Sequence, residues 1–223
     1  MAKAPIAGQV KTRLLPALTA EGAADLAYAL LVDQLDHLCG LDVADLYLAF
    51  TPEEARPQMA GLAPVNCGLF PQQGSELGQR MNRTFERLHD SGYREVVLIG
   101  GDIAPVPVHF VAAAYSFLDG ANHRVVLGPG RDGGYYLVGM NRLTPQIFTD
   151  MTWSHQQVLE QTLTRLDLLR IETQLLPVWF DVDTPDDLVF LRANLESELE
   201  ATMKNTSSLL RRLGMPGMNP KVS

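Results

Sequence analysis

Cysteine and histidine are scarce in this sequence. The only two cysteines, Cys39 and Cys67, form no C-x-x-C motif, and the count excludes a disulfide framework. None of the five histidines lies four residues from another, which argues against a histidine-based zinc site. No apolar run approaches the ~18 residues of a membrane span, and the first residues lack the apolar core of a signal peptide. We therefore expect a cytoplasmic protein.

Positive charge is also in deficit. Lys and Arg number 18 against 26 Asp and Glu, which gives a net charge of −8 over 223 residues. This balance argues against non-specific binding to nucleic acid or to an anionic membrane. A nucleotide is still compatible with it, because a nucleotide needs only a local cluster of cations. The oligomeric state is left open.

The stretch from Glu95 to Asp102 contains the clearest buried strand. Four consecutive branched apolar residues, 96–99, end in Gly100 and Gly101, and such a run bounded by a turn signal is typical of a strand buried on both faces. The two glycines let the backbone leave the sheet sharply. Asp102 would then lie at the carboxyl end of a central strand, where open α/β sheets bind ligands. Taken alone, Asp102 could equally be a turn or cap residue.

Strand patterns alternate with helix patterns along most of the chain. The expected strands are 45–50, 65–70, 96–99, 123–127, 135–140 and 170–176, and the expected helices are 19–38, 52–62, one ending near 90, 105–118, 154–169 and 184–200. This order predicts one α/β domain over residues 1–200, with a mostly parallel central sheet and helices on both faces. Residues 201–223 show no core face and are expected to be a peripheral or disordered tail.

A glycine-containing basic loop opens the chain. Residues 3–15 include Pro5 and Gly8 together with three cations, Lys3, Lys11 and Arg13. Exposed loop N–H groups beside cations can bind phosphates. The loop is not a Walker A motif, because Gly8 and Lys11 are not adjacent. A solvated basic loop is the alternative interpretation.

Carboxylates recur at turns beside glycine or proline, at Asp102, Asp132, Asp181 and Asp183. Mg²⁺ or Mn²⁺ is commonly held by one or two carboxylates together with phosphate oxygens. With the basic loop and Arg80 holding phosphates, these residues predict a site for a nucleoside di- or triphosphate and a metal. The reaction would be displacement at phosphorus or at an anomeric carbon.

Several of these residues can also be interpreted as structural rather than as metal or substrate ligands. Asp132 can simply cap the Gly133–Gly134 turn. Asp186 and Asp187 suit the start of a helix at Thr184-Pro185 better than a metal site. Because Tyr135 and Tyr136 point to opposite faces of a strand, we expect one ring in the core and one at a pocket.

Six short motifs, taken in order, resemble one known family. They are Lys3-Ala-Pro-x-x-Gly-x-Val-Lys-Thr-Arg-Leu14, Leu77-Gly78-x-Arg80-Met81, Gly100-x-Asp102, Leu127-Gly-Pro-x-x-Asp-Gly-Gly-Tyr-Tyr-Leu137, Trp153-Ser154 and Asp181-Val-Asp-Thr-Pro-Asp-Asp-Leu188. The family is the bacterial GT-A-type, glycosyltransferase-like group of nucleotide-diphospho-sugar transferases, some of them linked to arsenosugar biosynthesis. The chain is also similar to 2-phospho-lactate guanylyltransferase and to the molybdenum cofactor guanylyltransferase. At Gly101 and Ala104 it departs from the usual pattern, which has a hydroxyl residue and a proline there.

The resemblance implies a GT-A fold that binds a nucleotide sugar or an NTP, a small-molecule acceptor and Mg²⁺ or Mn²⁺. Asp102 and Asp132 are the expected catalytic residues, and Asp102 and Asp183 the expected metal ligands. The expected substrate-binding residues are Lys3, Pro5, Gly8, Lys11, Arg13, Gly78, Arg80, Gly100, Gly133, Gly134 and Tyr135. Glycosyl transfer is the leading prediction. Nucleotidyl transfer from an NTP to a phosphorylated acid and nucleotide binding without catalysis are the alternatives.

The start of the chain carries a separate expectation. In this kind of fold the phosphate loop follows a central first strand, yet only Met1 and Ala2 precede Lys3. A strand usually needs about five residues. We therefore expect that the native chain begins several apolar residues upstream of Met1.

Overall fold

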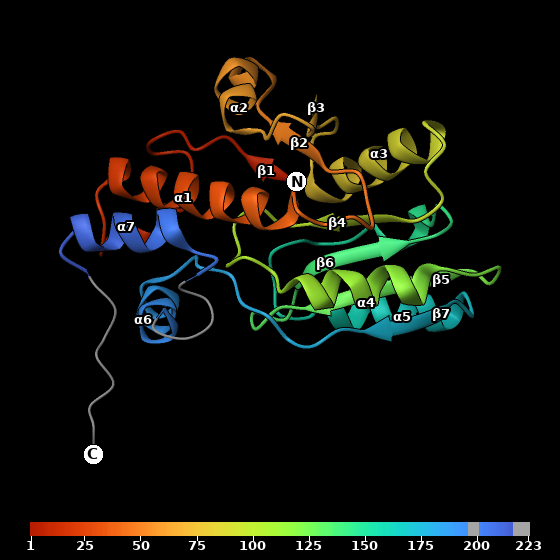
Figure 1. Ribbon diagram of the computed structural model, residues 1–223. Coiled ribbons are helices and arrows are strands. Elements are labelled where there is room, and N and C mark those ends of the chain that lie inside the picture. Colours follow the sequence, from red (N-terminus) through yellow and green to blue (C-terminus); the bar gives the residue numbers. More distant parts are fainter. Residues whose placement is uncertain (196–200, 216–223) are drawn as a thin grey trace. The chain divides into compact units, whose positions relative to one another are not determined.

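The computed structural model describes residues 1–195 and 201–215. Its contacts divide the chain into two compact units. Unit 1 comprises Met1, Pro71–Gly100 and Pro107–Phe180, and unit 2 comprises Ala2–Phe70, Gly101–Val106 and Asp181–Ser223. Each unit combines strands with helices, and the predicted α/β class is confirmed (Figure 1).

Unit 1 is built on a four-stranded sheet of order β4-β6-β5-β7. The strands are β4 (Val96–Ile99), β5 (Arg124–Pro129), β6 (Tyr135–Met140) and β7 (Glu172–Leu175). β5 and β7 run parallel, whereas β6 runs antiparallel to both β4 and β5. The reversal follows from the short connection between β5 and β6, because only antiparallel strands can be joined by a hairpin.

The helices of unit 1 are α3 (Leu77–Asp90), α4 (Val108–Leu118), the short 3-10 helix η3 (Pro145–Ile147) and α5 (Val158–Leu168). α3 packs against β4, and α4 packs against β5 and β6. Gly139 of β6 allows the close approach of α4, since an added Cβ would lie 3.0 Å from Leu118 Cδ1 and 2.8 Å from Val126 Cγ1. Val96–Ile99 forms a strand where the sequence predicted one, with Gly100 directly after it. The expectation of a central strand buried on both faces is wrong, because its residues alternate between buried and half-buried and β4 is the outer strand of this four-stranded sheet.

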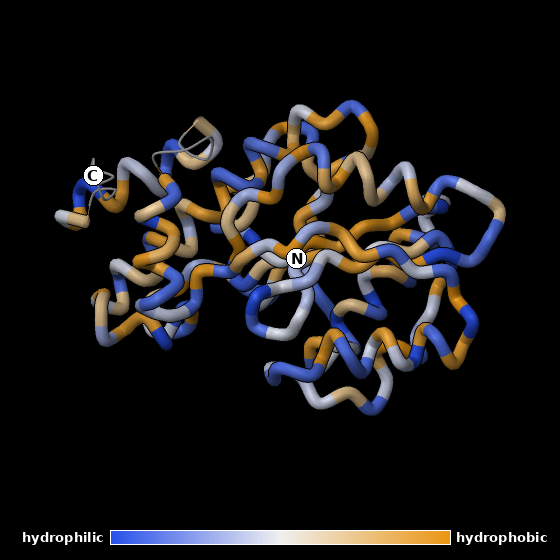
Figure 2. The backbone as a smooth tube through the Cα atoms, turned by 90° about the horizontal axis from the view of Figure 1, so that it is seen from below, coloured by the Kyte–Doolittle hydropathy of each residue, from blue (hydrophilic) through white to orange (hydrophobic). Residues whose placement is uncertain are grey.

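Unit 2 contains the sheet β1-β2-β3, formed by β1 (Ala2–Lys3), β2 (Tyr47–Thr51) and β3 (Gly68–Pro71). Its helical segments are η1 (Thr12–Leu14), α1 (Ala20–Leu38), η2 (Glu53–Ala55), α2 (Arg56–Leu62), α6 (Pro185–Asn194) and α7 (Lys204–Arg212). β1 pairs with β2 in parallel. The core joins Leu31 and Leu35 of α1, Leu48 and Phe50 of β2, and Met59 of α2. Along the helices, hydrophobic orange alternates with hydrophilic blue (Figure 2), as expected of helices with one buried face.

The sequence-based expectation of a peripheral tail after residue 200 is wrong for Lys204–Arg212. These residues form α7, which packs against α1 (Figure 1). The physical reason is a buried carboxylate: Asp33, 2% exposed, accepts hydrogen bonds from the backbone N–H groups of Asn205 and Thr206, both at 2.9 Å. These are orphan donors at the start of the helix. The expected helix end near 200 and the last residues of the tail, 216–223, lie outside the described residues.

The first strand of the structure lies at the start of the chain. β1 has 2 residues, and the amino group of Met1 donates a hydrogen bond to the carbonyl of Ile99 at 2.7 Å. The expectation of further residues upstream concerns sequence outside this chain and stays a prediction. Within residues 1–195 and 201–215, no helix combines the length and apolar character that crossing a membrane requires.

Candidate functional site

A buried lysine joins three distant segments of unit 2. The side chain of Lys11 is 1% exposed, and the residue has φ 47° and ψ 37°, in the left-handed region. Its ammonium donates to the carbonyls of Asp102 at 3.1 Å and Val182 at 2.9 Å, and lies 3.5 Å from Asp183 Oδ1. An ammonium has three protons, so these three acceptors can use all of them.

The segments that Lys11 joins also pair with each other. Ile103 and Asp181 form an antiparallel bridge, and the N–H of Val182 donates to the carbonyl of Asp102 at 3.4 Å. A third contact comes from α1, where Gln34 Oε1 accepts a hydrogen bond from the N–H of Val106 at 2.9 Å. The structure therefore brings together Asp102 and Asp183, the two predicted metal ligands.

Arg13 also contacts Asp183, from the solvent side. Its Nη2 atom lies 2.6 Å from Asp183 Oδ2, and the side chains are 66% and 27% exposed. The hydrogen bond with Asp183 and the charge of that carboxylate, with smaller contributions from Asp181 and Asp187, raise the pKa of Arg13. Lys11 and Arg13 are thus each in contact with a different oxygen of the same carboxylate.

The segment that carries Asp183 is fixed by the start of α6. Thr184 and Asp187 form a capping box, with Thr184 as the N-cap and proline in the first turn. Asp187 Oδ2 accepts from the N–H groups of Asp183 at 3.1 Å and Thr184 at 2.8 Å. The prediction that Asp187 serves the helix start is confirmed. Its position also holds the backbone of Asp183 in place.

The remaining residues of the basic loop have contacts within unit 2. Lys3 Nζ donates to the carbonyl of Gln9 at 2.6 Å, and the carbonyl of Pro5 accepts from Gln58 Nε2 at 3.2 Å. Gly8 has φ +76° and open space where a side chain would lie. The ammonium of Lys11 is buried and has protein acceptors, and its predicted role as a phosphate ligand stays a prediction. Arg13 is the exposed cation beside the carboxylates.

Asp102 and Asp183 could each supply a carboxylate oxygen to a divalent cation whose remaining ligands include phosphate oxygens. Asp102 is exposed and Asp183 is half-buried, and Mg²⁺ in nucleotide sites is often held by one or two carboxylates plus substrate oxygens. Among residues 1–195 and 201–215, no group of three or more His, Cys, Asp or Glu side chains is placed to hold a metal ion by itself. Metal binding by Asp102 and Asp183 stays a prediction, and such a metal ion would need further ligands from water or substrate.

In unit 1, Asp132 belongs to a self-contained turn. Its Oδ1 accepts a hydrogen bond from the N–H of Gly134 at 2.9 Å, and the N–H of Gly130 donates to the carbonyl of Gly134 at 3.0 Å. Gly133 has φ +87°, and an added Cβ would lie 2.1 Å from the carbonyl oxygen of Gln156. These contacts support the alternative in which Asp132 caps the turn. A catalytic role for Asp132 stays a prediction.

The other predicted residues of unit 1 have packing or loop contacts. An added Cβ at Gly78 would lie 2.8 Å from the Trp153 ring. Arg80 Nε donates to the carbonyl of Gly74 at 3.0 Å, and the N–H of Gly100 donates to the carbonyl of Tyr136 at 3.0 Å. The hydroxyl of Tyr135 is buried, and the substrate role predicted for this residue stays a prediction.

Both tyrosines have contacts within the protein. The Tyr135 ring lies edge-on to Trp153, with 6.5 Å between centroids, and burial raises the pKa of Tyr135. Tyr136 is 5% exposed and its hydroxyl donates to the carbonyl of Pro177 at 3.1 Å. The two rings thus have different partners, and the expectation that one of them lines a pocket stays a prediction.

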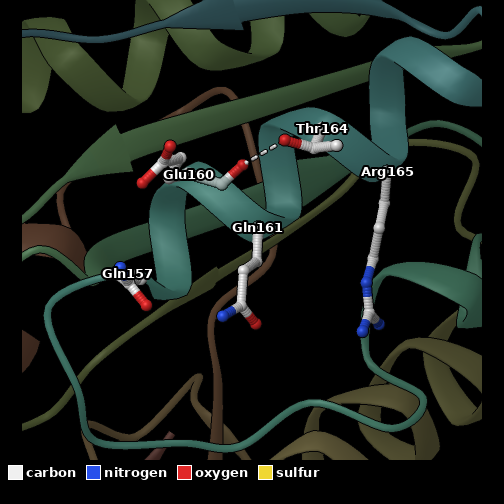
Figure 3. A pocket seen from close by; sticks show the side chains of 5 residues that line it. All are labelled: Gln157, Glu160, Gln161, Thr164 and Arg165. Atoms are coloured by element: carbon white, nitrogen blue, oxygen red, sulfur yellow. Dashed lines mark hydrogen bonds between the residues drawn. The ribbon is translucent and has the colours of Figure 1, made fainter.

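A shallow groove of about 390 Å³ lies along α5, lined by Gln157, Glu160, Gln161, Thr164 and Arg165 (Figure 3). Two of its side chains, Thr164 and Arg165, form hydrogen bonds within the protein. Thr164 Oγ1 donates to the carbonyl of Glu160 at 2.9 Å, and Arg165 donates to the carbonyls of Gln146, Thr149 and Asp150. The groove contains none of the predicted site residues, and we assign it no function.

The sequence interpretation missed one positioning residue, Gln34. It is 3% exposed and lies on α1 among buried leucines, including Leu30, Leu31 and Leu35. A polar side chain within an apolar helix face was the available signal, because a buried amide usually has a hydrogen-bond partner. Its partner is the backbone just beyond Asp102.

Comparison with solved structures identifies proteins of similar structure. A "putative nucleotide-diphospho-sugar transferase" from Desulfovibrio desulfuricans G20 is 32% identical, with a TM-score of 0.81 and 94% of each chain covered. The 4-diphosphocytidyl-2C-methyl-D-erythritol synthase from Anaerococcus prevotii is 9% identical, with a TM-score of 0.54 over 75% of this chain and 86% of that one. A homologue of Mycobacterium tuberculosis rv0371c from Mycobacterium sp. strain JC1 is 16% identical, with a TM-score of 0.50 over 78% and 83%. The last two share the fold.

No curated protein matches the sequence. A family model does match it, over residues 34–155. That match covers more than half of the chain, and the Desulfovibrio relative extends the similarity over nearly all of it. The chain belongs to the family described as "Uncharacterized protein conserved in bacteria (DUF2064)".

Proposed function

We propose that this protein is a nucleotide-binding transferase that moves a glycosyl group from a nucleotide-diphospho-sugar to a small-molecule acceptor, with Mg²⁺ or Mn²⁺. One observation carries the proposal: exposed Arg13 contacts Asp183, which Lys11 ties to the turn at Asp102. An exposed guanidinium and a carboxylate, beside the backbone of a second acidic residue, match the needs of a diphosphate bound with a divalent cation. The similarity to the Desulfovibrio protein supports the same reaction class.

Each residue of this cluster has a distinct role in the proposal. Arg13 binds phosphate oxygens through its planar fork of N–H donors. Asp102 and Asp183 would hold the divalent cation, which when bound stabilises negative charge on the diphosphate leaving group. Lys11 is a positioning residue, since its ammonium is buried against the backbone of Asp102 and Val182. Asp187 positions Asp183 through the backbone N–H of that residue.

Ligand-dependent thermal stability tests the proposal. The protein is melted with nucleoside diphosphate sugars and with NTPs, each with and without Mn²⁺, because a ligand that binds the folded state raises the midpoint of unfolding. Stabilisation by diphosphate sugars, followed by sugar transfer, is expected. Stabilisation by triphosphates alone, with release of pyrophosphate, would indicate nucleotidyl transfer instead. Binding without turnover would indicate a non-catalytic nucleotide-binding protein, and no response to either class of nucleotide would contradict the proposal.

A further inference from the structure

Both oxygens of the Asp183 carboxylate are in contact with cations of the protein. Lys11 Nζ lies 3.5 Å from Oδ1, and Arg13 Nη2 lies 2.6 Å from Oδ2. The proposed function requires the same carboxylate to bind a divalent metal ion. Each carboxylate oxygen has two lone pairs, so a free acceptor direction remains on both. A divalent ion bound there would nevertheless lie next to the guanidinium and the ammonium, and the repulsion between these positive charges favours the departure of one protein cation.

The two protein cations differ in how readily they can leave. Lys11 is 1% exposed and has two backbone carbonyls as further partners, so moving it would leave buried acceptors unpaired, which is costly. Arg13 is 66% exposed, so water can solvate its guanidinium after it separates from Asp183. Exposed ion pairs of this kind contribute little stability. Arg13 is therefore the cation that can be exchanged.

We propose that Arg13 and the divalent cation compete for Asp183. When the metal ion binds Asp183, the Arg13 guanidinium leaves the carboxylate and binds the phosphates of the nucleotide. This inference rests on the proposed function and adds to it a coupling between the two ligands. Before the exchange, the guanidinium is paired with the carboxylate. After it, the carboxylate is paired with the metal ion and the guanidinium with phosphate. No charge is left unpaired, so metal and nucleotide favour each other's binding.

The inference makes an unusual prediction about Arg13→Gln. Removing a phosphate ligand should weaken diphosphate binding, yet removing a competitor should tighten the binding of Mn²⁺ alone. We expect Mn²⁺ in phosphate-free buffer to bind about fivefold more tightly, which matches the upper range for an exposed ion pair. Binding of inorganic pyrophosphate with EDTA present should become weaker. Arg13→Lys keeps a competing cation and should bind Mn²⁺ about as the natural protein does.

Arg212→Gln is the matched control for the loss of one positive charge. Arg212 is also exposed, at 70%, lies in unit 2, and pairs with a different carboxylate, Asp25, at 3.3 Å. Its replacement should change Mn²⁺ affinity by less than about twofold, since screening limits the effect of a distant exposed charge. A similar tightening in Arg212→Gln and Arg13→Gln would overturn the inference, because net charge alone would then explain both.

A double-mutant cycle with Asp183→Asn completes the test. Contacting residues show an interaction energy in such a cycle, so Arg13→Gln should no longer tighten Mn²⁺ binding once the carboxylate is gone. Mn²⁺ binding is measured by titration calorimetry and by the loss of the free-ion electron paramagnetic resonance signal. Equal Mn²⁺ affinity in the natural protein and Arg13→Gln, including no detectable binding in either, overturns the exchange. The proposed function fails on a different result, the absence of nucleotide binding by the natural protein.

Discussion

Two acidic turns of this protein look alike in sequence and differ in structure. Asp183 in unit 2 and Asp132 in unit 1 each lie beside residues that favour turns, Pro185 and Gly133. Asp183 contacts two cationic side chains, Lys11 and Arg13, from the other end of the chain. Asp132 accepts a hydrogen bond from the backbone N–H two residues ahead. The comparison shows that similar turn residues can accompany a carboxylate with long-range cationic partners and a carboxylate bonded within its own turn.

The largest expected effect tests how rigid the Asp132 turn is. Gly133→Ala places a Cβ 2.1 Å from the carbonyl oxygen of Gln156, at φ +87°. Left-handed strain and overpacking together should lower the free energy of unfolding by about 3–5 kcal/mol, measured by urea denaturation. Gly8→Ala is the control, because Gly8 has φ +76° and open space around an added Cβ. It should cost only about 1–2 kcal/mol, and equal losses would contradict the close packing at Gly133.

The next effect concerns the buried cation of the Asp183 cluster. Lys11→Met removes the donor to the carbonyls of Asp102 and Val182 and the partner of Asp183. We expect unfolding free energy to fall by about 2–4 kcal/mol, since buried polar groups lose their partners. Lys3→Met, at an exposed lysine, should change it by less than about 0.5 kcal/mol. A Lys11 variant as stable as the Lys3 variant would show that the lysine does not hold these segments together.

The third prediction compares the two turns as ligand sites. Asp102→Asn should keep the fold, because Asp102 is exposed, and should weaken Mn²⁺-dependent nucleotide affinity by about tenfold, or about 1.4 kcal/mol. Asp132→Asn should change that affinity by less than about twofold, because an amide oxygen can still accept the N–H of Gly134. Calorimetric titrations with and without Mn²⁺ measure both. If both variants lost the same amount of Mn²⁺-dependent nucleotide affinity, the two turns would have the same function in ligand binding.

The smallest expected effect concerns the helix start beside Asp183. Asp187→Ala removes the acceptor for the N–H groups of Asp183 and Thr184 and should cost about 1 kcal/mol of unfolding free energy. Asp186→Ala removes only an exposed charge in the same first turn and should cost about 0.3–0.5 kcal/mol. Thermal denaturation at matched ionic strength distinguishes them. A larger loss for Asp186→Ala would contradict the capping box.

Features that depend on neighbouring residues were predictable from the sequence. The apolar run at 96–99 became β4, and Thr184-Pro185 with Asp187 became the capped start of α6. The α/β class followed from the alternation of strand and helix patterns. In each of these cases the deciding interactions, such as a hydrogen bond from the third helical N–H to the cap, connect residues close together along the chain. The spacing of residue types is therefore enough to predict these local structures.

Features that depend on distant residues were decided only by the tertiary structure. The sequence showed that Lys11 and Arg13 are cations of one loop, but it could not show that one is 1% exposed and the other 66%. It did not predict that Asp33 would bind the start of α7 or that Gln34 would hold the chain beyond Asp102. The physical reason is that burial and partner choice depend on which surfaces pack together. Lys11 finds its acceptors at Asp102 and Val182, and that proximity exists only after the chain has folded.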